Sequence, residues 1–170
     1  LGELASELDI AKGTIYKHFK SKNQLYLELI ILNERKLLDI SKKYKNNIKT
    51  YVSQYMLYNM LNSNRTILLH VIEDRLTNNE KKLKELFEEL YQVREERIIE
   101  IKDMTDEYLK SLDSAMSIRD YLSYVWTVTY GASLLLNSTH YQKSIGSRER
   151  LIKLYINQAL MTPDKISSVG

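Results

Sequence analysis

Apolar residues recur every three or four positions along most of the chain, the pattern of helices that each bury one face. The pattern predicts short helices over residues 1–7 and 11–18. A long helix is expected over 22–44, with an apolar stripe formed by Leu25, Leu29, Leu32, Leu37, Ile40 and Tyr44. Ser21 and Gln24 have the spacing of a capping box, whose side chains bond the free amides at a helix start, so we expect the long helix to begin there.

The remainder of the chain predicts further helices separated by polar turns. A stretch rich in Tyr and Met over 48–61 precedes the polar turn at 62–64, and helices are expected over 65–76, 79–112 and 117–138. A loop with Gly146 precedes a last helix over 148–161, which Pro163 is expected to stop because proline lacks an amide donor. We see no strand-like alternation, so we expect an all-α fold.

The composition supports this fold class and excludes several others. The 170 residues include 5 Gly and 1 Pro, too few for the many turns of a β-sandwich or barrel. Hydrophobic residues make up 44% and charged residues 28%, which is ordinary for a globular protein. With 0 Cys, neither a disulfide nor a Cys-ligated metal site is expected. The pattern of residue types changes near residue 44, and we expect two domains, 1–44 and 45–170.

The positive charge is concentrated near the start of the chain. A net charge of +3 does not by itself indicate a nucleic-acid partner. Residues 11–22, however, contain no acidic residue and four lysines, Lys12, Lys17, Lys20 and Lys22. Two short helices followed by a capped long helix are typical of a helix-turn-helix, and a basic second helix suits the DNA major groove. The alternative interpretation is a helical hairpin with a solvated lysine face.

The stretch KGTIYKHFKSK at residues 12–22, with Leu4 and Ala5 ahead of it, closely resembles the DNA-binding domain of the tetracycline-repressor (TetR) family. It departs from that pattern at three positions: Asp9 stands where glycine is usual, Ala11 where a Ser or Thr cap is usual, and Lys20 where proline is common. The first helix of the family has no counterpart here, so we expect further residues ahead of the chain.

The resemblance implies an N-terminal helix-turn-helix DNA-binding domain, with a connecting helix, followed by a C-terminal helical ligand-binding and dimerisation domain. It implies that residues 11–18 form the recognition helix, in which Thr14 and Lys17 contact base edges. Gly13 allows close backbone approach, and Tyr16, His18 and Lys22 hold phosphates. The expected DNA-binding residues are Lys12, Gly13, Thr14, Tyr16, Lys17, His18 and Lys22.

Members of the family line a helical cavity that binds a small-molecule inducer. Tyr and Trp suit such a cavity because each has a flat apolar body and a polar tip, and Met adapts to shape. The expected ligand-binding residues are Tyr55, Tyr58, His70, Met104, Tyr121, Trp126 and Tyr130. For each of them, plain core packing is the alternative. Arg94 and Arg97 either face an anionic ligand or are solvated.

The family also pairs its last two helices with those of a second copy in a four-helix dimer interface. Residues 117–138 are apolar nearly all round in their middle, and Gly131 would let two helices approach closely. The alternative is a helix in the interior of one chain. The resemblance therefore implies a homodimer that binds a near-palindromic operator in double-stranded DNA.

Little in the sequence points to catalysis. His18, His70 and His140 lack the spacing of metal ligands, and neither a phosphate-binding glycine loop nor a nucleophile elbow is present. We therefore expect no enzyme, no metal and no cofactor. The resemblance implies a cytoplasmic repressor that an inducer releases from its operator. The rival hypotheses are a helical scaffold or adaptor that binds partner helices, and a sensor that has lost DNA binding.

Overall fold

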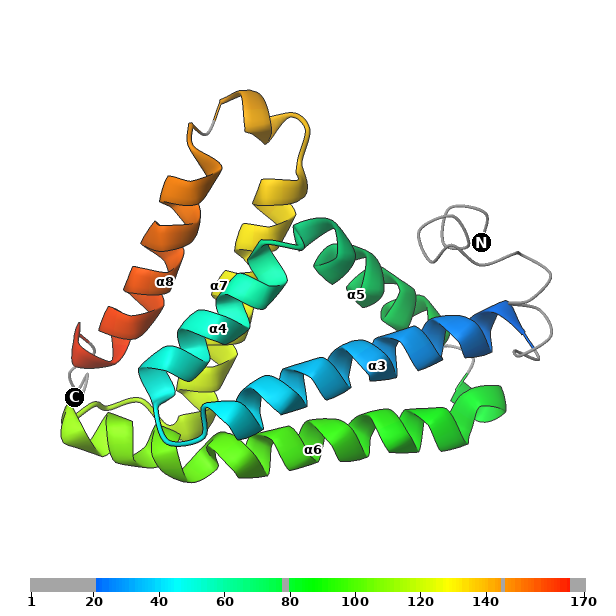
Figure 1. Ribbon diagram of the computed structural model, residues 1–170, viewed down its shortest axis with the longest axis horizontal. Coiled ribbons are helices and arrows are strands. Elements are labelled where there is room, and N and C mark those ends of the chain that lie inside the picture. The colour runs from blue at the N-terminus through cyan, green and yellow to red at the C-terminus, as the bar shows by residue number, and fades with distance from the viewer. Residues whose placement is uncertain (1–20, 78–79, 145, 166–170) are drawn as a thin grey trace.

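The computed structural model describes residues 21–77, 80–144 and 146–165. Within these ranges every regular element is a helix, which confirms the all-α prediction. The helices are α3 (Lys22–Lys43), α4 (Ile48–Met60), α5 (Ser63–Thr77), α6 (Glu80–Ser111), α7 (Ile118–Asn137) and α8 (Arg148–Lys165), with a short 3₁₀ helix, η1 (Tyr141–Lys143) (Figure 1). The predicted helix-turn-helix at residues 1–20 lies outside the described residues.

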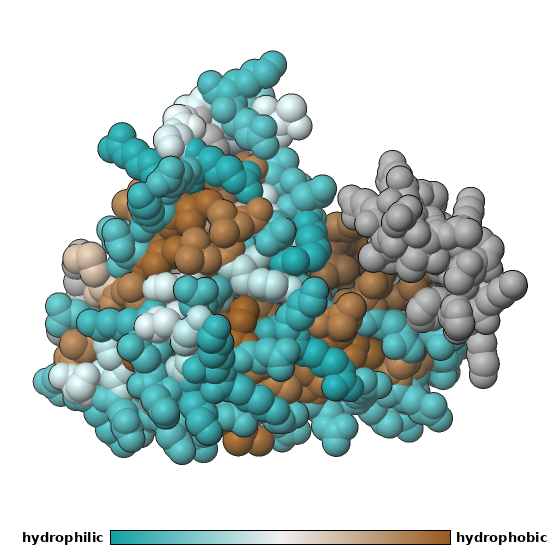
Figure 2. All heavy atoms as spheres, in the orientation of Figure 1, coloured by the Kyte–Doolittle hydropathy of each residue, from teal (hydrophilic) through white to brown (hydrophobic). Residues whose placement is uncertain are grey.

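Helix α3 begins where the sequence predicts. Ser21 is its N-cap, and the Ser21 side chain accepts a hydrogen bond from the Gln24 amide at 3.1 Å. The buried face differs from the expected stripe, because Leu32 is 51% exposed whereas the carboxylate-bearing Glu34 is only 5% exposed. Leu32 instead lines a groove with Leu61 and Leu68, which are also more than half exposed. Figure 2 shows apolar side chains reaching the surface between α3 and α5, and again between α4 and α8.

Helices α3 and α6 lie side by side and run in the same direction (Figure 1). The pairs Arg35–Glu89 and Lys42–Glu96, each joined at 2.6 Å, have the same sequence separation of 54, as parallel neighbours require. The sequence predicts one uninterrupted helix over 79–112, but α6 is interrupted near its start. Leu83 has non-helical dihedral angles of φ −123° and ψ 15°.

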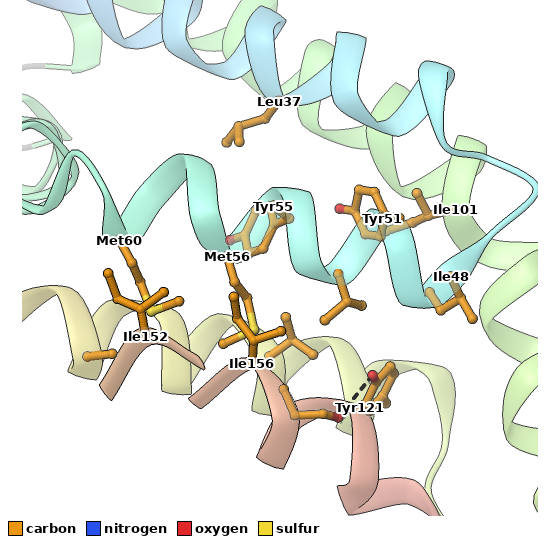
Figure 3. Close-up of a cluster of buried hydrophobic side chains, with 14 of the residues drawn as sticks. Leu37, Ile48, Tyr51, Tyr55, Met56, Met60, Ile101, Tyr121, Ile152 and Ile156 are labelled. Carbon is orange, nitrogen blue, oxygen red and sulfur yellow. Dashed lines mark hydrogen bonds between the residues drawn. The ribbon is translucent and has the colours of Figure 1, made fainter. Parts of the chain in front are cut away.

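Two apolar clusters form the core of the described residues. The smaller joins the first half of α3 to the end of α5 and the start of α6, with Leu27, Ile31 and Phe87 among its members. The larger lies among α4, α7, α8 and the second halves of α3 and α6 (Figure 3). Along α3 and α6, polar residues separate the two clusters, and the candidate site lies at this boundary.

Pro163 does not stop the last helix, contrary to the sequence-based prediction. Helix α8 passes through Pro163 and ends at Lys165. A proline at this position cannot donate to the carbonyl oxygen of Ala159, four residues earlier. The hydroxyl of Tyr121 donates to that oxygen at 3.1 Å, drawn as the dashed line in Figure 3. The hydroxyl of Tyr108 donates to the next carbonyl oxygen, that of Leu160, at 2.8 Å. Side-chain donors from neighbouring helices therefore satisfy the carbonyls at the interruption.

Candidate functional site

A cavity of about 370 Å³ opens between the two apolar clusters, with walls from α3, α4, α5, α6 and α7. Its volume falls in the lower part of the range of small-molecule sites, about 300–1,000 Å³. One wall is aromatic and another is charged.

The aromatic wall comes from α5 and α7. Trp126 and Tyr130, one helical turn apart on α7, stack with ring centroids 4.6 Å apart and an interplanar angle of 26°. His70 of α5 meets both rings edge-on, at 6.1 Å from Trp126 and 5.4 Å from Tyr130. Trp126 is 45% exposed. Tyr55 of α4 contributes a fourth ring to the cavity lining.

The charged wall is a network of two arginines and two glutamates. Arg94 donates from Nε to Glu34 Oε2 at 3.1 Å, and from both terminal nitrogens to Glu73, at 2.6 and 2.8 Å. Arg97 donates from Nε to Glu34 Oε1 at 2.9 Å and from Nη1 to the Tyr51 hydroxyl at 3.4 Å. Glu34 therefore holds both arginines, and the network joins α3, α4, α5 and α6.

Burial and mutual charge shape the ionisation of this wall. Burial disfavours the charged forms of Arg94 and Arg97 and so acts to lower the pKa of each. The carboxylates of Glu73 and Glu34 outweigh burial at Arg94, and the carboxylate of Glu34 does so at Arg97. Both pKa values are therefore raised. Burial raises the pKa of the Tyr55 phenol well above its ordinary value, although the nearby charge of Arg97 opposes the shift. Burial likewise raises the pKa of Tyr130. Both arginines therefore stay charged and both tyrosines stay neutral near pH 7.

Four of the seven residues expected to bind a ligand line this cavity: Tyr55, His70, Trp126 and Tyr130. Met104 and Tyr121 instead pack in the larger apolar cluster. Tyr58 lines the separate groove between α3 and α5, where its hydroxyl donates to Asn33 Oδ1 at 2.9 Å. The Arg65 guanidinium lies 4.2 Å from the centre of the Tyr58 ring.

Sequence reasoning missed the acidic residues of the cavity, Glu34, Glu73 and Asp74. The available signal was positional, because Glu34 falls between Ile31 and Leu38 on the buried side of α3. A charged residue at such a position needs partners, and Arg94 and Arg97 supply them. The alternative, that these arginines are solvated, fits the structure less well, since the side chain of Arg94 is 34% exposed and that of Arg97 is 14% exposed.

Of the residues expected to bind DNA, Lys12, Gly13, Thr14, Tyr16, Lys17 and His18 lie outside the described residues. Lys22 is the first residue of α3, exposed, with its ammonium 5.4 Å from the centre of the Tyr26 ring. Glu34 lies twelve residues further along the same helix, about 18 Å away at 1.5 Å per residue. One continuous helix thus links the end of the basic segment to the cavity.

In residues 21–77, 80–144 and 146–165, no helix is long and apolar enough to cross a membrane. The same residues contain no group of three or more His, Asp or Glu side chains placed to hold a metal ion.

The first residues of the chain are similar to those of known proteins. Residues 1–29 match the model of a family described as bacterial regulatory proteins, tetR family. The chain is 37% identical over 60 residues to the HTH-type transcriptional regulator QacR of Staphylococcus aureus (strain Mu50 / ATCC 700699), covering 35% of this chain and 32% of that protein. It is 30% identical over 83 residues to the HTH-type transcriptional regulator AcrR of Shigella flexneri, covering 49% of this chain and 35% of that protein. The matches thus span about a third of each relative's length.

Proposed function

Since this chain belongs to the tetR family of bacterial regulatory proteins through its N-terminal segment, we propose that it is a DNA-binding transcriptional repressor controlled by a small molecule in the α3–α7 cavity. The observation that carries the proposal is the path of α3, which begins at Lys22 within the matched residues 1–29 and supplies Glu34 to the cavity wall.

The DNA-binding part of the proposal depends on the basic segment at residues 11–22. Thr14 and Lys17 contact base edges, and Tyr16, His18 and Lys22, with Lys12 and Gly13, hold the phosphate backbone. The exposed position of Lys22 at the N-terminus of α3 supports its role, because helix N-termini favour anions.

The regulatory part is a shift between two arrangements of α3. A ligand in the cavity contacts α5, α6 and α7, and through the Glu34 network it also acts on α3. A ligand that binds one arrangement more tightly shifts the population toward it. The inducer therefore releases DNA by favouring an arrangement of α3 in which the recognition helices no longer match successive major grooves about 34 Å apart.

We further propose a homodimer formed through α7 and α8, which binds a near-palindromic operator. Leu134 of α7 and Leu154 and Met161 of α8 are 60%, 47% and 46% exposed, which is much apolar surface for two adjacent helices. Gly131 lies three residues before Leu134, and a Cβ placed there would have no neighbour within 4 Å. That open face has room for a helix of a second copy. The division into domains 1–44 and 45–170, and a cytoplasmic location, are parts of the same proposal.

The test is DNA binding by the full chain, measured by fluorescence anisotropy on duplexes selected from a random library. We expect affinity to fall steeply with salt, and Lys17→Ala to weaken binding and reduce the salt slope by about 1. Tyr16→Ala should also weaken it. Lys153→Ala, an exposed lysine of α8, is the matched control and should bind as wild type does.

Equal binding by Lys17→Ala, Tyr16→Ala and wild type would overturn the assigned DNA-binding residues. Recovery of no selected duplex, together with a stable dimer, would instead favour a sensor that does not bind DNA. Recovery of no duplex and no dimer would leave the helical scaffold as the better interpretation.

A further inference from the structure

We propose that the groove between α3 and α5 is a second small-molecule site, which takes an alkyl chain that ends in a carboxylate. The volume of the groove is about 720 Å³, within the range of small-molecule sites. Among the described residues, it shares no lining residue with the α3–α7 cavity. Such a site is separate from the proposed function and does not depend on it.

The cations of the groove have no acidic neighbour in its lining. Lys36 of α3, Arg65 of α5 and Arg148 of α8 line it, whereas no Asp or Glu of the described residues does. None of the three cations forms an ion pair in the part of the chain that the structure describes. In the α3–α7 cavity, by contrast, Glu34 and Glu73 hold both arginines. The groove therefore favours an anionic ligand.

The groove is charged at one end and apolar at the other. Helices α3 and α5 run in opposite directions (Figure 1), and the first half of α3 packs against the end of α5. Lys36 therefore lies toward Arg65, whereas Leu29 lies toward Ile72. A ligand with a charged head and an apolar tail matches this arrangement.

Arg65 has a donor without a partner at the charged end. Its guanidinium lies 4.2 Å from the centre of the Tyr58 ring, and Nη2 donates to the Tyr58 carbonyl oxygen at 3.1 Å. The Nε atom of Arg65 is buried and has no hydrogen-bond partner among the described residues. Buried polar atoms are nearly always paired with protein, water or another molecule. A carboxylate here supplies an acceptor and a counter-charge, and the planar guanidinium suits its two oxygens.

Arg148 adds a fixed positive charge to the same end, close to the junction of α4 and α5. Its terminal nitrogens donate to the carbonyl oxygens of Met60 and Leu136, each at 3.0 Å, and to the Ser63 hydroxyl at 3.1 Å. All three acceptors are neutral, so they hold the guanidinium in place without cancelling its charge. An anion beside Arg65 is therefore attracted by Arg148 even without a direct contact.

The apolar part of the groove suits an alkyl tail. Leu32 of α3 and Leu68 of α5 are 51% and 54% exposed, and they lie between the charged and the apolar ends of their helices. Leu29 and Lys36 are seven residues apart on α3, about 10 Å at 1.5 Å per residue. A chain laid along that length removes the exposed leucine surface, and its own methylene groups, from water.

The experiment compares three probes that share one alkyl chain and differ in the charge of the head group: octanoate, 1-octanol and octylammonium. Binding to the full chain is measured by isothermal titration calorimetry near neutral pH. We expect octanoate to bind about tenfold more tightly than 1-octanol, because it adds a charge-assisted bond at Arg65. Octylammonium should bind more weakly than both, and added salt should reduce the preference for octanoate.

Matched variants test the two ends of the groove. Arg65→Gln should remove most of the tenfold preference, and Arg75→Gln, at an exposed arginine of α5 outside the groove, should retain it. Leu68→Ser should weaken octanoate and 1-octanol about threefold, whereas Ile99→Ser, at a 65% exposed isoleucine of α6 outside the groove, should weaken neither. Trp126→Phe alters the α3–α7 cavity and should leave octanoate binding unchanged. The three probes on wild type decide the head group even if Arg65→Gln folds poorly.

Four results would overturn the proposal. The first is binding of 1-octanol or octylammonium as tightly as octanoate, and the second is a preference that survives Arg65→Gln. The third is octanoate binding that Trp126→Phe weakens and Leu68→Ser does not, which would place the anion in the α3–α7 cavity. The fourth is binding of none of the probes. If Leu68→Ser then also changes the sedimentation mass, the groove is an interface between copies of the chain.

Discussion

The hydroxyl of Tyr121 donates to the carbonyl oxygen of Ala159 at 3.1 Å, and this oxygen is the one that Pro163 cannot reach with an amide. Tyr121 is fully buried, so the bond connects the core face of α7 to the last helix. It explains how α8 tolerates an internal proline and why a phenol, and not a phenylalanine ring, stands at this position in the core.

Removing that hydroxyl should destabilise the fold only as long as Pro163 is present. We expect Tyr121→Phe to lower the free energy of unfolding by about 1 kcal/mol, because the Ala159 oxygen loses its donor. In a Pro163→Ala background the helix regains an amide at position 163, and the same substitution should cost much less. Urea titration of the four proteins measures the coupling. An equal cost in both backgrounds would refute the explanation, and Tyr141→Phe, at a half-exposed tyrosine, is the control.

Glu34 should be far more important to stability than a surface glutamate in a similar pair. The Glu34 side chain is 6% exposed and holds two arginines, so Glu34→Gln leaves buried positive charge without its partner and should cost roughly 3 kcal/mol. Glu89→Gln breaks the exposed pair with Arg35, in which the side chain of Glu89 is 40% exposed, and should cost less than about 0.5 kcal/mol. Comparable urea midpoints for the two variants would contradict the assigned network.

Stability should fall in alkali partly because of Tyr55. Burial holds the pKa of its phenol above the ordinary value of 10.0, so the folded state keeps a proton that the unfolded state loses first. This contribution is fully present below pH 10 and is lost as the pH rises above it, by up to about 1.4 kcal/mol per pH unit. Urea titrations at pH 9 and pH 11 should show that the free energy of unfolding falls less between these two pH values for Tyr55→Phe than for wild type. Tyr91→Phe, at a tyrosine that is 45% exposed, should lose as much as wild type.

The proposed dimer can be tested at one leucine. Leu134→Glu places a charge on the open face of α7 next to Gly131, and it should shift sedimentation from dimer to monomer and abolish specific DNA binding. Leu68→Glu alters a leucine on α5 that is also more than half exposed, and it should leave the mass unchanged. A monomeric wild type, or a dimeric Leu134→Glu, would argue against an interface at α7 and α8.

The fold was largely predictable because periodic apolar positions and caps are local signals. Ser21 marked the start of α3, and the long apolar repeat marked α6 to within a few residues. The interruption at Leu83 and the passage of α8 through Pro163 were not predictable, since the second depends on donors from Tyr121 and Tyr108, far away in the sequence.

The candidate site was predictable only in its aromatic half. Residue type singled out Tyr55, His70, Trp126 and Tyr130, which line one cavity, but it also selected Met104 and Tyr121, which pack in the core. Side-chain chemistry cannot distinguish a ring at a cavity wall from a ring inside a core. The pairing of Glu34 with Arg94 and Arg97, 60 and 63 residues away, depends on the parallel register of α3 and α6 and has no local signal.

The network of two arginines and two glutamates lies between the two apolar clusters, where it can act as a hinge. Apolar packing tolerates small sliding movements, whereas a guanidinium bound to two carboxylates loses its bonds when either partner moves by an ångström or two. The two halves therefore meet at a plane that is held by direction-dependent bonds and lies next to a cavity. Under the proposed function, a small molecule bound in that cavity changes the angle between the two halves while each half stays folded.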